Sequence, residues 1–266
     1  MLTSDWRLLN LSYDSVYSNL ALEEALIECC QSDVFRPTAR IWINHAAAVV
    51  GRYQDVALEV DAEYCRKNRI QIARRFTGGG TVYHDEGNLN LTIVGEICGV
   101  DLHEIRHRNL LIVQNALSQF GVESSINLPN SVLVQGKKIS GASAAVRRSY
   151  FLWHASLLVS TNLESIAQAL SPSKNLGPTS HVRSQWQPIT NLAITLGSPV
   201  EMREVKKRII ISVEKILEVH IKESTLTNCE ERTAKSLHQK YYSAEWNKKG
   251  VTPSRKRNDA HTTIAV

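Results

Sequence analysis

The stretch Arg74–Asp85, RRFTGGGTVYHD, places three consecutive glycines between a pair of arginines and a His-Asp pair. Consecutive glycines cost backbone entropy in a strand. An ordered Gly-Gly-Gly therefore indicates positive φ angles, or a group that approaches the backbone too closely for a Cβ. Backbone N–H groups beside two arginines would bind an anion such as a phosphate or a carboxylate. An anion site is the favoured interpretation, and a flexible hairpin tip is the alternative.

Apolar runs that predict β-strands flank the glycine run on both sides, at residues 71–75 and 81–94. The remaining predicted strands are 6–13, 39–44, 46–52, a hairpin over 131–146, and 149–160. The predicted helices are 15–31, 61–68, 101–120, 199–219 and 230–241, with a further helix opened by a Thr161/Glu164 capping box. Strands and helices mix without a βαβα rhythm. The sequence therefore predicts an α+β fold, with a mixed, largely antiparallel β-sheet core flanked by helices.

The segment 171–199 holds four of the seven prolines and is predicted to be a long loop. The C-terminal stretch 248–266 is basic and almost without apolar residues, which is typical of a disordered tail. We therefore expect one folded domain over residues 1–247, followed by that tail.

Composition narrows the classes of function. The chain has 266 residues and 43% apolar content, which is ample for a core. It has no run of about 18 apolar residues and no signal-peptide pattern, so we expect a cytoplasmic protein that does not enter a membrane. The net charge is +5 without a basic stripe interleaved with aromatics, which disfavours nucleic acid as a partner. Five cysteines without a C-x-x-C pair predict reduced, mostly buried thiols.

One metal-like motif is not expected to bind metal. His103 and His107 match H-E-x-x-H, which on a buried helix face would hold Zn²⁺. With residues spaced at 100° around the helix, both histidines lie about 100 to 140° from the centre of its apolar arc. The two imidazoles are therefore expected to face solvent or the rim of the helix.

Two further groups of residues could carry chemistry. Lys137 and Lys138 follow a predicted Gln135-Gly136 turn, and a lysine ammonium there suits a phosphate oxygen or a substrate carboxylate. Two solvated lysines at a turn are the alternative. His154 lies on the predicted strand 149–160, where a hydrogen-bonded core histidine is the alternative to a functional one.

These three blocks, in this order, resemble the lipoate-protein ligase A family of the biotin/lipoyl ligase superfamily. The family pattern R-R-x-[ST]-G-G-G-[AT]-V-[FY]-H-D-x-G-N is matched by residues 74–88, the pattern K-[IV]-x-G by 138–141, and a His-initiated strand by 154–158. The stretches VVGRYQ (49–54) and KYYSAEWN (240–247) are also similar to family members. The resemblance thus extends over nearly all of residues 5–247 and implies a ligase catalytic domain.

The resemblance implies two half-reactions. Lipoate and MgATP would give lipoyl-AMP and pyrophosphate, and the acyl group would then pass to a lysine of a lipoyl domain. Lys138 would be catalytic, because it would hold the carboxylate and the α-phosphate together. Mg²⁺ would arrive with ATP, since no metal motif of the chain supplies its ligands. The residues implied to bind ATP and lipoate are Arg75, Gly78, Gly79, Gly80, Thr81, Val82, Tyr83, His84, Asn130, Lys138 and His154.

Several points stay open at this stage. An apolar tunnel for the acyl tail is expected near Val49, Val82 and Leu158, and the base for the transfer step could be His84, Asp85 or water. Family members commonly have Asn-Asp where this chain has Asn130-Ser131. That departure puts a carboxylate contribution to nucleotide or Mg²⁺ binding in doubt.

The resemblance also implies partners. Acceptors would be lipoyl domains of 2-oxoacid dehydrogenase E2 subunits and the H protein of glycine cleavage. The length resembles the archaeal type, in which an accessory domain is a separate small subunit. Two alternatives are an octanoyl or lipoyl transferase with an acyl carrier donor, and a non-catalytic subunit that binds lipoyl-adenylate. The first needs a cysteine nucleophile after the lysine motif, and no cysteine lies between Cys98 and Cys229.

Overall fold

The computed structural model of this chain describes residues 5–31, 35–170 and 180–249. Within that part of the chain, eight strands form the main sheet, in the spatial order β11 (His220–Glu223), β1 (Asp5–Asn10), β2 (Thr38–Trp42), β6 (Asn88–Glu96), β10 (Tyr150–Leu158), β9 (Lys137–Arg147), β8 (Ser131–Val134) and β7 (Ser125–Asn127). A smaller sheet holds β4 (Gln71–Arg74), β3 (Ala47–Val50) and β5 (Val82–His84).

The main sheet is mixed. β1 runs parallel to both β11 and β2, whereas every pairing from β2 across to β7 is antiparallel. In the smaller sheet β3 is parallel to β4 and antiparallel to β5. The predicted α+β class, with a largely antiparallel sheet flanked by helices, is confirmed.

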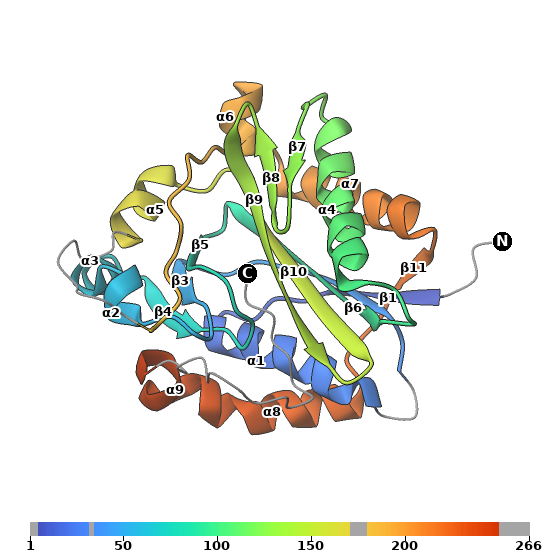
Figure 1. Cartoon of the computed structure of the whole chain (residues 1–266), viewed down its shortest axis with the longest axis horizontal. Coiled ribbons are helices and arrows are strands. Elements are labelled where there is room, and N and C mark those ends of the chain that lie inside the picture. The colour runs from blue at the N-terminus through green and yellow to red at the C-terminus, as the bar shows by residue number, and fades with distance from the viewer. Residues whose placement is uncertain (1–4, 32–34, 171–179, 250–266) are drawn as a thin grey trace.

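Helices cover both faces of the main sheet (Figure 1). α1 (Val16–Glu28) and α8 (Asn228–Tyr242) lie along one side, and α4 (Leu102–Ser118) and α7 (Met202–Leu217) along the other. The shorter helices are α2 (Val56–Glu59), α3 (Ala62–Lys67), α5 (Leu163–Ala169), α6 (Leu192–Leu196), α9 (Ala244–Lys249) and the 3-10 turn η1 (Cys29–Gln31). The larger apolar core lies between the sheet and the α4–α7 pair.

Alternation along the central strands decides which face becomes polar. On β6, Leu89, Leu91 and Ile93 enter the core beneath α4 and α7. Because successive side chains of a strand point to opposite faces, Asn90 and Thr92 face the α1 side. The register pairs Thr92 with His154 of β10, so that face of the sheet carries a row of polar groups beneath α1.

Three local predictions are wrong. The stretch 81–94 is two strands in different sheets, because the Asp85 carboxylate accepts the N–H of Gly87 and turns the chain between β5 and β6. The Thr161/Glu164 capping box does not form. Asn162 caps α5 instead, by accepting the N–H of Ser165. The predicted loop 171–199 contains α6, which Asn191 caps in the same way. Residues 171–179 of that loop lie outside the described part of the chain.

The prediction that all thiols are reduced is also wrong, because Cys29 and Cys229 form a disulfide between η1 and α8. A separation of 200 residues gave no sequence signal for this pairing. Cys30 and Cys65 are free and buried, as expected, and Cys98 is free and exposed. α9 ends at Lys249, so the predicted tail falls almost wholly on residues 250–266, outside the described residues. No helix in the described ranges is both long and apolar enough to cross a bilayer.

Candidate functional site

The two arginines that precede the glycines point to different places. Arg74 is fully buried and donates to the carbonyl oxygens of Gly51, Gln54, Trp246 and Asn247. It therefore ties β4 to α9 and takes no part in an anion site.

The side chain of Arg75 extends into the glycine loop, which we define as residues 76–81. Its Nε donates to Thr77 Oγ1 at 3.0 Å, and its Nη1 donates to the carbonyl of Val49 at 2.9 Å. Its Nη2 donates to the carbonyls of Gly78 and Gly80 at 2.6 and 2.7 Å. Burial, with Arg74 alongside, lowers the pKa of Arg75 to about 10, so it remains charged at neutral pH. Arg75 thus shapes the loop from within and adds a positive charge behind it.

The loop turns its carbonyls inward and leaves amide N–H groups available. In the described part of the chain, the N–H groups of Gly79 and Gly80 donate to no protein acceptor. Gly79 has a φ of +85°, which a residue with a Cβ rarely adopts. A Cβ at Gly51 would overlap the carbonyl oxygen of Gly79, so β3 and the loop require glycine on both sides. These features match the expected anion nest.

Ser184, which is distant in the sequence, also holds the glycine loop through hydrogen bonds. The Ser184 hydroxyl accepts the N–H of Thr81 at 2.9 Å and an N–H of the Gln54 amide at 3.0 Å. Gln54 Oε1 in turn accepts the N–H of Gly51 and the Thr81 hydroxyl. The N–H of Ser184 donates to the buried carboxylate of Glu59. Gln54 and Ser184 therefore fix the loop although neither belongs to the glycine motif.

Lys138 lies on β9, next to the Gln135-Gly136 turn. Both turn residues have positive φ angles, as the predicted hairpin requires. No side chain of the described residues pairs with Lys138 Nζ, and burial together with the charge of Arg75 lowers its pKa from the ordinary value. A Cβ at Gly141 would lie 2.8 Å from Lys138 Cε and 3.2 Å from Nζ. The lysine therefore crosses the backbone of Gly141 so closely that a Cβ there would displace the end of its side chain.

Two cavities meet at Lys138. The glycine-loop cavity, of about 350 Å³, lies between the loop, β6 and β10, and the α5 cavity, of about 470 Å³, lies between α5, β9 and β10. Lys138, Thr81 and Val82 line both. The predicted residues that line the glycine-loop cavity are Arg75, Gly79, Gly80, Thr81, Val82, His84, Asn130, Lys138 and His154, while Tyr83 lines the α5 cavity. Gly78 lines neither, because its carbonyl accepts from Arg75 and Ser143.

The tautomer of His84 follows from a series of hydrogen bonds that starts at the guanidinium of Arg40, a group that can only donate. Arg40 donates to Asn19 Oδ1, so Asn19 Nδ2 donates to Asn44 Oδ1, and Asn44 Nδ2 donates to His84 Nδ1. The remaining ring nitrogen, Nε2, then carries the proton. Burial, with Arg75 close by, lowers the pKa of His84 from 6.5 to about 3. His84 is therefore a neutral N–H donor in the wall of the glycine-loop cavity.

His154 belongs to the same buried network. Its Nδ1 bonds Glu23 Oε2 at 2.9 Å and its Nε2 bonds Thr77 Oγ1 at 2.9 Å. Glu23 also pairs with Arg40 at 3.1 Å. Burial alone would raise the pKa of Glu23, but the hydrogen bond from His154 and the charge of Arg40 hold it below its ordinary value. His154 thus links the glycine loop to a buried carboxylate on α1.

Two other predicted residues have local roles. Asp85 Oδ1 accepts the N–H of Gly87 and its Oδ2 accepts the N–H of Asn162, so its carboxylate closes a turn. Asn130 accepts the N–H of Ala142 on its carbonyl and the Ser131 hydroxyl on Oδ1, which leaves its Nδ2 for a ligand. It lies at the rim of the glycine-loop cavity.

The motif analysis missed the support behind the site: Glu23, Arg40, Asn44, Gln54 and Ser184. One signal was available for the polar wall that Asn90 contributes to the glycine-loop cavity. The pattern Asn-Leu-Asn-Leu-Thr-Ile at 88–93 alternates polar and apolar residues, which predicts a strand with one polar face.

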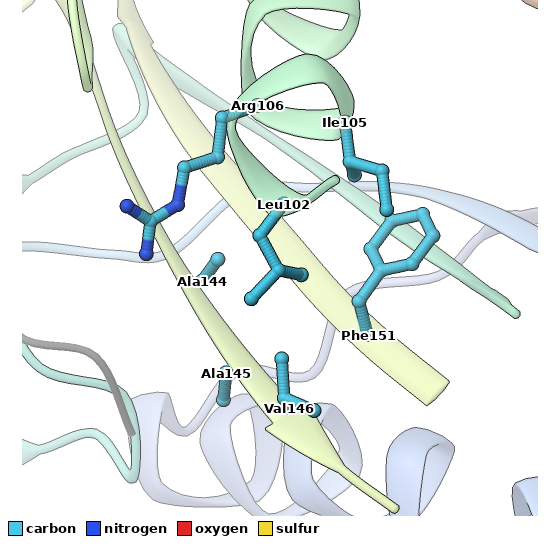
Figure 2. A pocket seen from close by; sticks show the side chains of 7 residues that line it. All are labelled: Leu102, Ile105, Arg106, Ala144, Ala145, Val146 and Phe151. Carbon is cyan, nitrogen blue, oxygen red and sulfur yellow. The ribbon is translucent and has the colours of Figure 1, made fainter. Parts of the chain in front are cut away.

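Two other features do not form ligand sites. Figure 2 shows a gap between α4 and the β9–β10 pair, with the Arg106 side chain extending toward β9. Its volume is about 10 Å³, room for a single water at most. His103 and His107 are exposed, as expected. Among the described residues no group of three or more His, Cys, Asp and Glu side chains is arranged to hold a metal ion.

The chain is similar to known proteins of one family. Residues 15–214 match the family described as the lipoyl protein ligase A/B catalytic domain. Lipoate-protein ligase A subunit 1 of Thermoplasma acidophilum is 31% identical over 240 residues, which cover 86% of this chain and 90% of that protein. A crystal structure of lipoate-protein ligase A bound with ATP superposes with a TM-score of 0.80, at 29% identity over 91% of this chain and 98% of that one.

A structural study of a bipartite lipoate protein ligase and its E2 lipoyl domain from T. acidophilum contains a chain with a TM-score of 0.83 and 28% identity, covering 95% of this chain and 100% of that one. The family match spans more than half of the chain, and the glycine loop and Lys138 lie within it. The chain therefore belongs to the lipoyl protein ligase A/B catalytic domain family.

Proposed function

We propose that this protein is an ATP-dependent lipoate–protein ligase that forms lipoyl-AMP and transfers the lipoyl group to a lysine of a lipoyl domain. The observation that carries the proposal is the position of Lys138, whose ammonium has no protein partner among the described residues and lies where two ligand-sized cavities meet. The amides of Gly79 and Gly80, which donate to no acceptor among the described residues, belong to residues that line the glycine-loop cavity. The names of the relatives and the ATP-bound structure support the same activity.

Each cavity suits one part of the adenylate. Leu20, Trp42, Val49 and Ala155 give the glycine-loop cavity an apolar floor, which fits an acyl chain. Leu163, Ile166 and Leu170 give the α5 cavity an apolar wall, which fits a purine. Of the residues expected to form the acyl tunnel, Val49 and Val82 line the glycine-loop cavity and Leu158 lines the α5 cavity.

In the first half-reaction a lipoate carboxylate oxygen attacks the α-phosphorus of ATP, and the bond from that phosphorus to pyrophosphate breaks. Negative charge builds on the phosphoryl oxygens. Lys138 and the amides of Gly79 and Gly80 stabilise this charge. The loop already holds the two amides in place, so they need little reorganisation as the charge develops. Arg75 adds a further positive charge from behind the loop.

In the second half-reaction the acceptor amine attacks the lipoyl carbonyl carbon, the bond to AMP breaks, and the attacking nitrogen loses a proton. His84 does not suit the role of base, because its Nδ1 accepts from Asn44 and its Nε2 already carries a proton. Asp85 does not suit it either, since both carboxylate oxygens accept backbone N–H groups. We therefore assign the removal of the proton to water, with His84 donating from Nε2 to an oxygen of the substrate.

Mg²⁺ would bind at this site together with the nucleotide. Glu59, in the α5 cavity, is the one carboxylate among the described residues that line either cavity, and it accepts from Arg183 and from the N–H of Ser184. Mg²⁺ commonly keeps several waters and binds through substrate phosphates. The protein would therefore contact the ion mainly through the phosphates that Lys138 and the glycine loop hold.

The acceptors follow from the same resemblance. The T. acidophilum study names an E2 lipoyl domain for its bipartite ligase, and we propose lipoyl domains of E2 subunits and the glycine cleavage H protein as acceptors here. We also propose a separate small accessory subunit; the relative from T. acidophilum is itself named subunit 1 of its ligase.

The test is lipoylation of an apo lipoyl domain, followed by the mass of its acceptor lysine. Lipoate with MgATP is compared with octanoyl carrier protein in the absence of ATP. The proposal expects the modification only with lipoate and ATP, together with lipoate-dependent exchange of pyrophosphate into ATP. Transfer from the carrier alone would overturn it. The residues that line the two cavities within the described ranges include no cysteine, which disfavours a thioester route.

A further inference from the structure

An arch of five residues, 184–188, bridges the opening of the site. At one end Ser184 accepts the N–H of Thr81 in the glycine loop. At the other end the carbonyl of Pro188 accepts the N–H of Lys138 at 2.7 Å, and the next residues continue a short parallel pairing with β9. At the centre of the arch, Trp186 is 87% exposed. Both ends of the arch are thus fixed to the site, while its largest side chain is mostly exposed and lines the α5 cavity.

A second large apolar side chain is exposed beside the glycine-loop cavity. Leu128, in the loop between β7 and β8, is 59% exposed and lines the glycine-loop cavity. Gln185 and Gln187, the neighbours of Trp186, line the same cavity. Trp186 lines the α5 cavity, which adjoins the glycine-loop cavity at Lys138. Single exposed apolar residues are ordinary, but two that line adjoining cavities indicate a contact surface.

The chemistry of transfer limits what can occupy this rim. A lysine side chain spans about 6 Å from Cα to Nζ when extended over five bonds of about 1.5 Å. An acceptor lysine that reaches the junction at Lys138 must therefore bring its own backbone against the opening. The charged residues that line the two cavities, histidines apart, are Arg75, Lys138, Arg183 and Glu59, and Glu59 is paired with Arg183. The lining of the two cavities is consequently cationic, which favours an acidic surface beside the incoming lysine.

We propose that Trp186 and Leu128 form the docking rim for the acceptor, a protein domain that presents its lysine on an exposed turn with acidic neighbours. The assignment rests on the proposed ligase function. Trp is the residue type most enriched among interface positions that dominate binding, and an arch fixed at both ends pays little ordering entropy on contact. The docking rim therefore contributes to the second half-reaction, whereas adenylate formation depends mainly on the residues inside the two cavities.

The test separates the two half-reactions in Trp186→Ala and Leu128→Ala. The KM for an apo lipoyl domain is expected to rise about 30-fold in Trp186→Ala and about 5-fold in Leu128→Ala. The KM values for ATP and lipoate in pyrophosphate exchange, and the capture of the acyl group by hydroxylamine, are expected to change by a smaller factor than the KM for the apo domain, because each side chain is more than half exposed. Trp186→Phe keeps an aromatic ring and should recover most of the lost affinity. Ile211→Ala, which removes a 42% exposed side chain on α7, is the matched control and should behave as wild type.

Several outcomes would overturn the assignment. If exchange in Trp186→Ala falls as much as transfer does, the indole covers the nucleotide rather than the acceptor. If transfer to the protein domain and capture by hydroxylamine fall together, the rim does not recognise a protein. Binding of the apo domain can be measured by calorimetry, independently of catalysis. Equal affinity of the wild type and Trp186→Ala for the domain would overturn the assignment of the docking rim, whether or not the wild-type chain forms an adenylate. Absence of exchange in the wild type, with normal domain binding, would instead refute the proposed ligase function.

Discussion

Replacing Gly141 by alanine moves the Lys138 side chain without removing it. The new Cβ would lie 2.8 Å from Lys138 Cε and 3.2 Å from Nζ. Carbon atoms in contact normally lie about 3.5 to 4.0 Å apart, so the end of the lysine must move by about 1 Å. The clash involves the far end of a flexible side chain, and the backbone of β9 need not change.

The expected effect is large on catalysis and small on folding. A misplacement of about 1 Å in a catalytic group can cost about 100-fold in rate, and we expect that loss in kcat/KM for lipoate-dependent pyrophosphate exchange. In contrast, Gly→Ala in a strand removes entropy from the unfolded chain and changes the free energy of unfolding by about 1 kcal/mol or less. The variant should therefore melt near the wild-type temperature.

A double-mutant cycle decides whether the loss passes through the lysine. If Gly141→Ala acts only by displacing Lys138, the double variant with Lys138→Ala should be no slower than Lys138→Ala alone. Exchange within threefold of wild type in Gly141→Ala would refute the placement of Lys138 over this glycine. A double variant much slower than Lys138→Ala would show that alanine harms the site by another route.

Three further variants test other parts of the site. Lys138→Ala should lower the exchange rate by about 100- to 1000-fold, as loss of one preorganised donor does, whereas its exposed neighbour Lys137→Ala should stay near wild type in the same assay. Glu23→Gln leaves the buried Arg40 without its carboxylate and should lower the free energy of unfolding by about 3 to 5 kcal/mol in urea titrations; a loss below about 1 kcal/mol would contradict the buried pair. Because the pKa of His84 falls from 6.5 to about 3 on folding, the unfolded chain binds the extra proton between these values. Stability should therefore be complete above about pH 6.5 and decline by about 1.4 kcal/mol per pH unit below it, more steeply than in His84→Gln; equal slopes would refute the buried neutral imidazole.

The local chemistry of the site was predictable from the sequence. Gly79 needs a positive φ, and Gln135-Gly136 adopts the turn that its composition predicts, so the glycine loop and the β8–β9 hairpin were placed correctly. Helical angles also predicted that His103 faces solvent. Predictions failed where a tertiary contact competed with a local pattern. The pattern of residues 81–94 predicts one strand. The Asp85 carboxylate instead accepts the N–H groups of Gly87 and Asn162, and the stretch is divided between two sheets.

The sequence by itself determined which backbone can approach an anion, since glycine conformation and strand alternation act over a few neighbouring residues. Only the tertiary structure decided what supports that backbone. Glu23 and His154 are 131 residues apart and Thr81 and Ser184 are 103 apart, and no periodic pattern links positions at such distances. The fold also decided the direction of the two arginines. Arg74 turned to the carbonyls near α9 and Arg75 turned into the loop, because adjacent residues of a strand point to opposite faces.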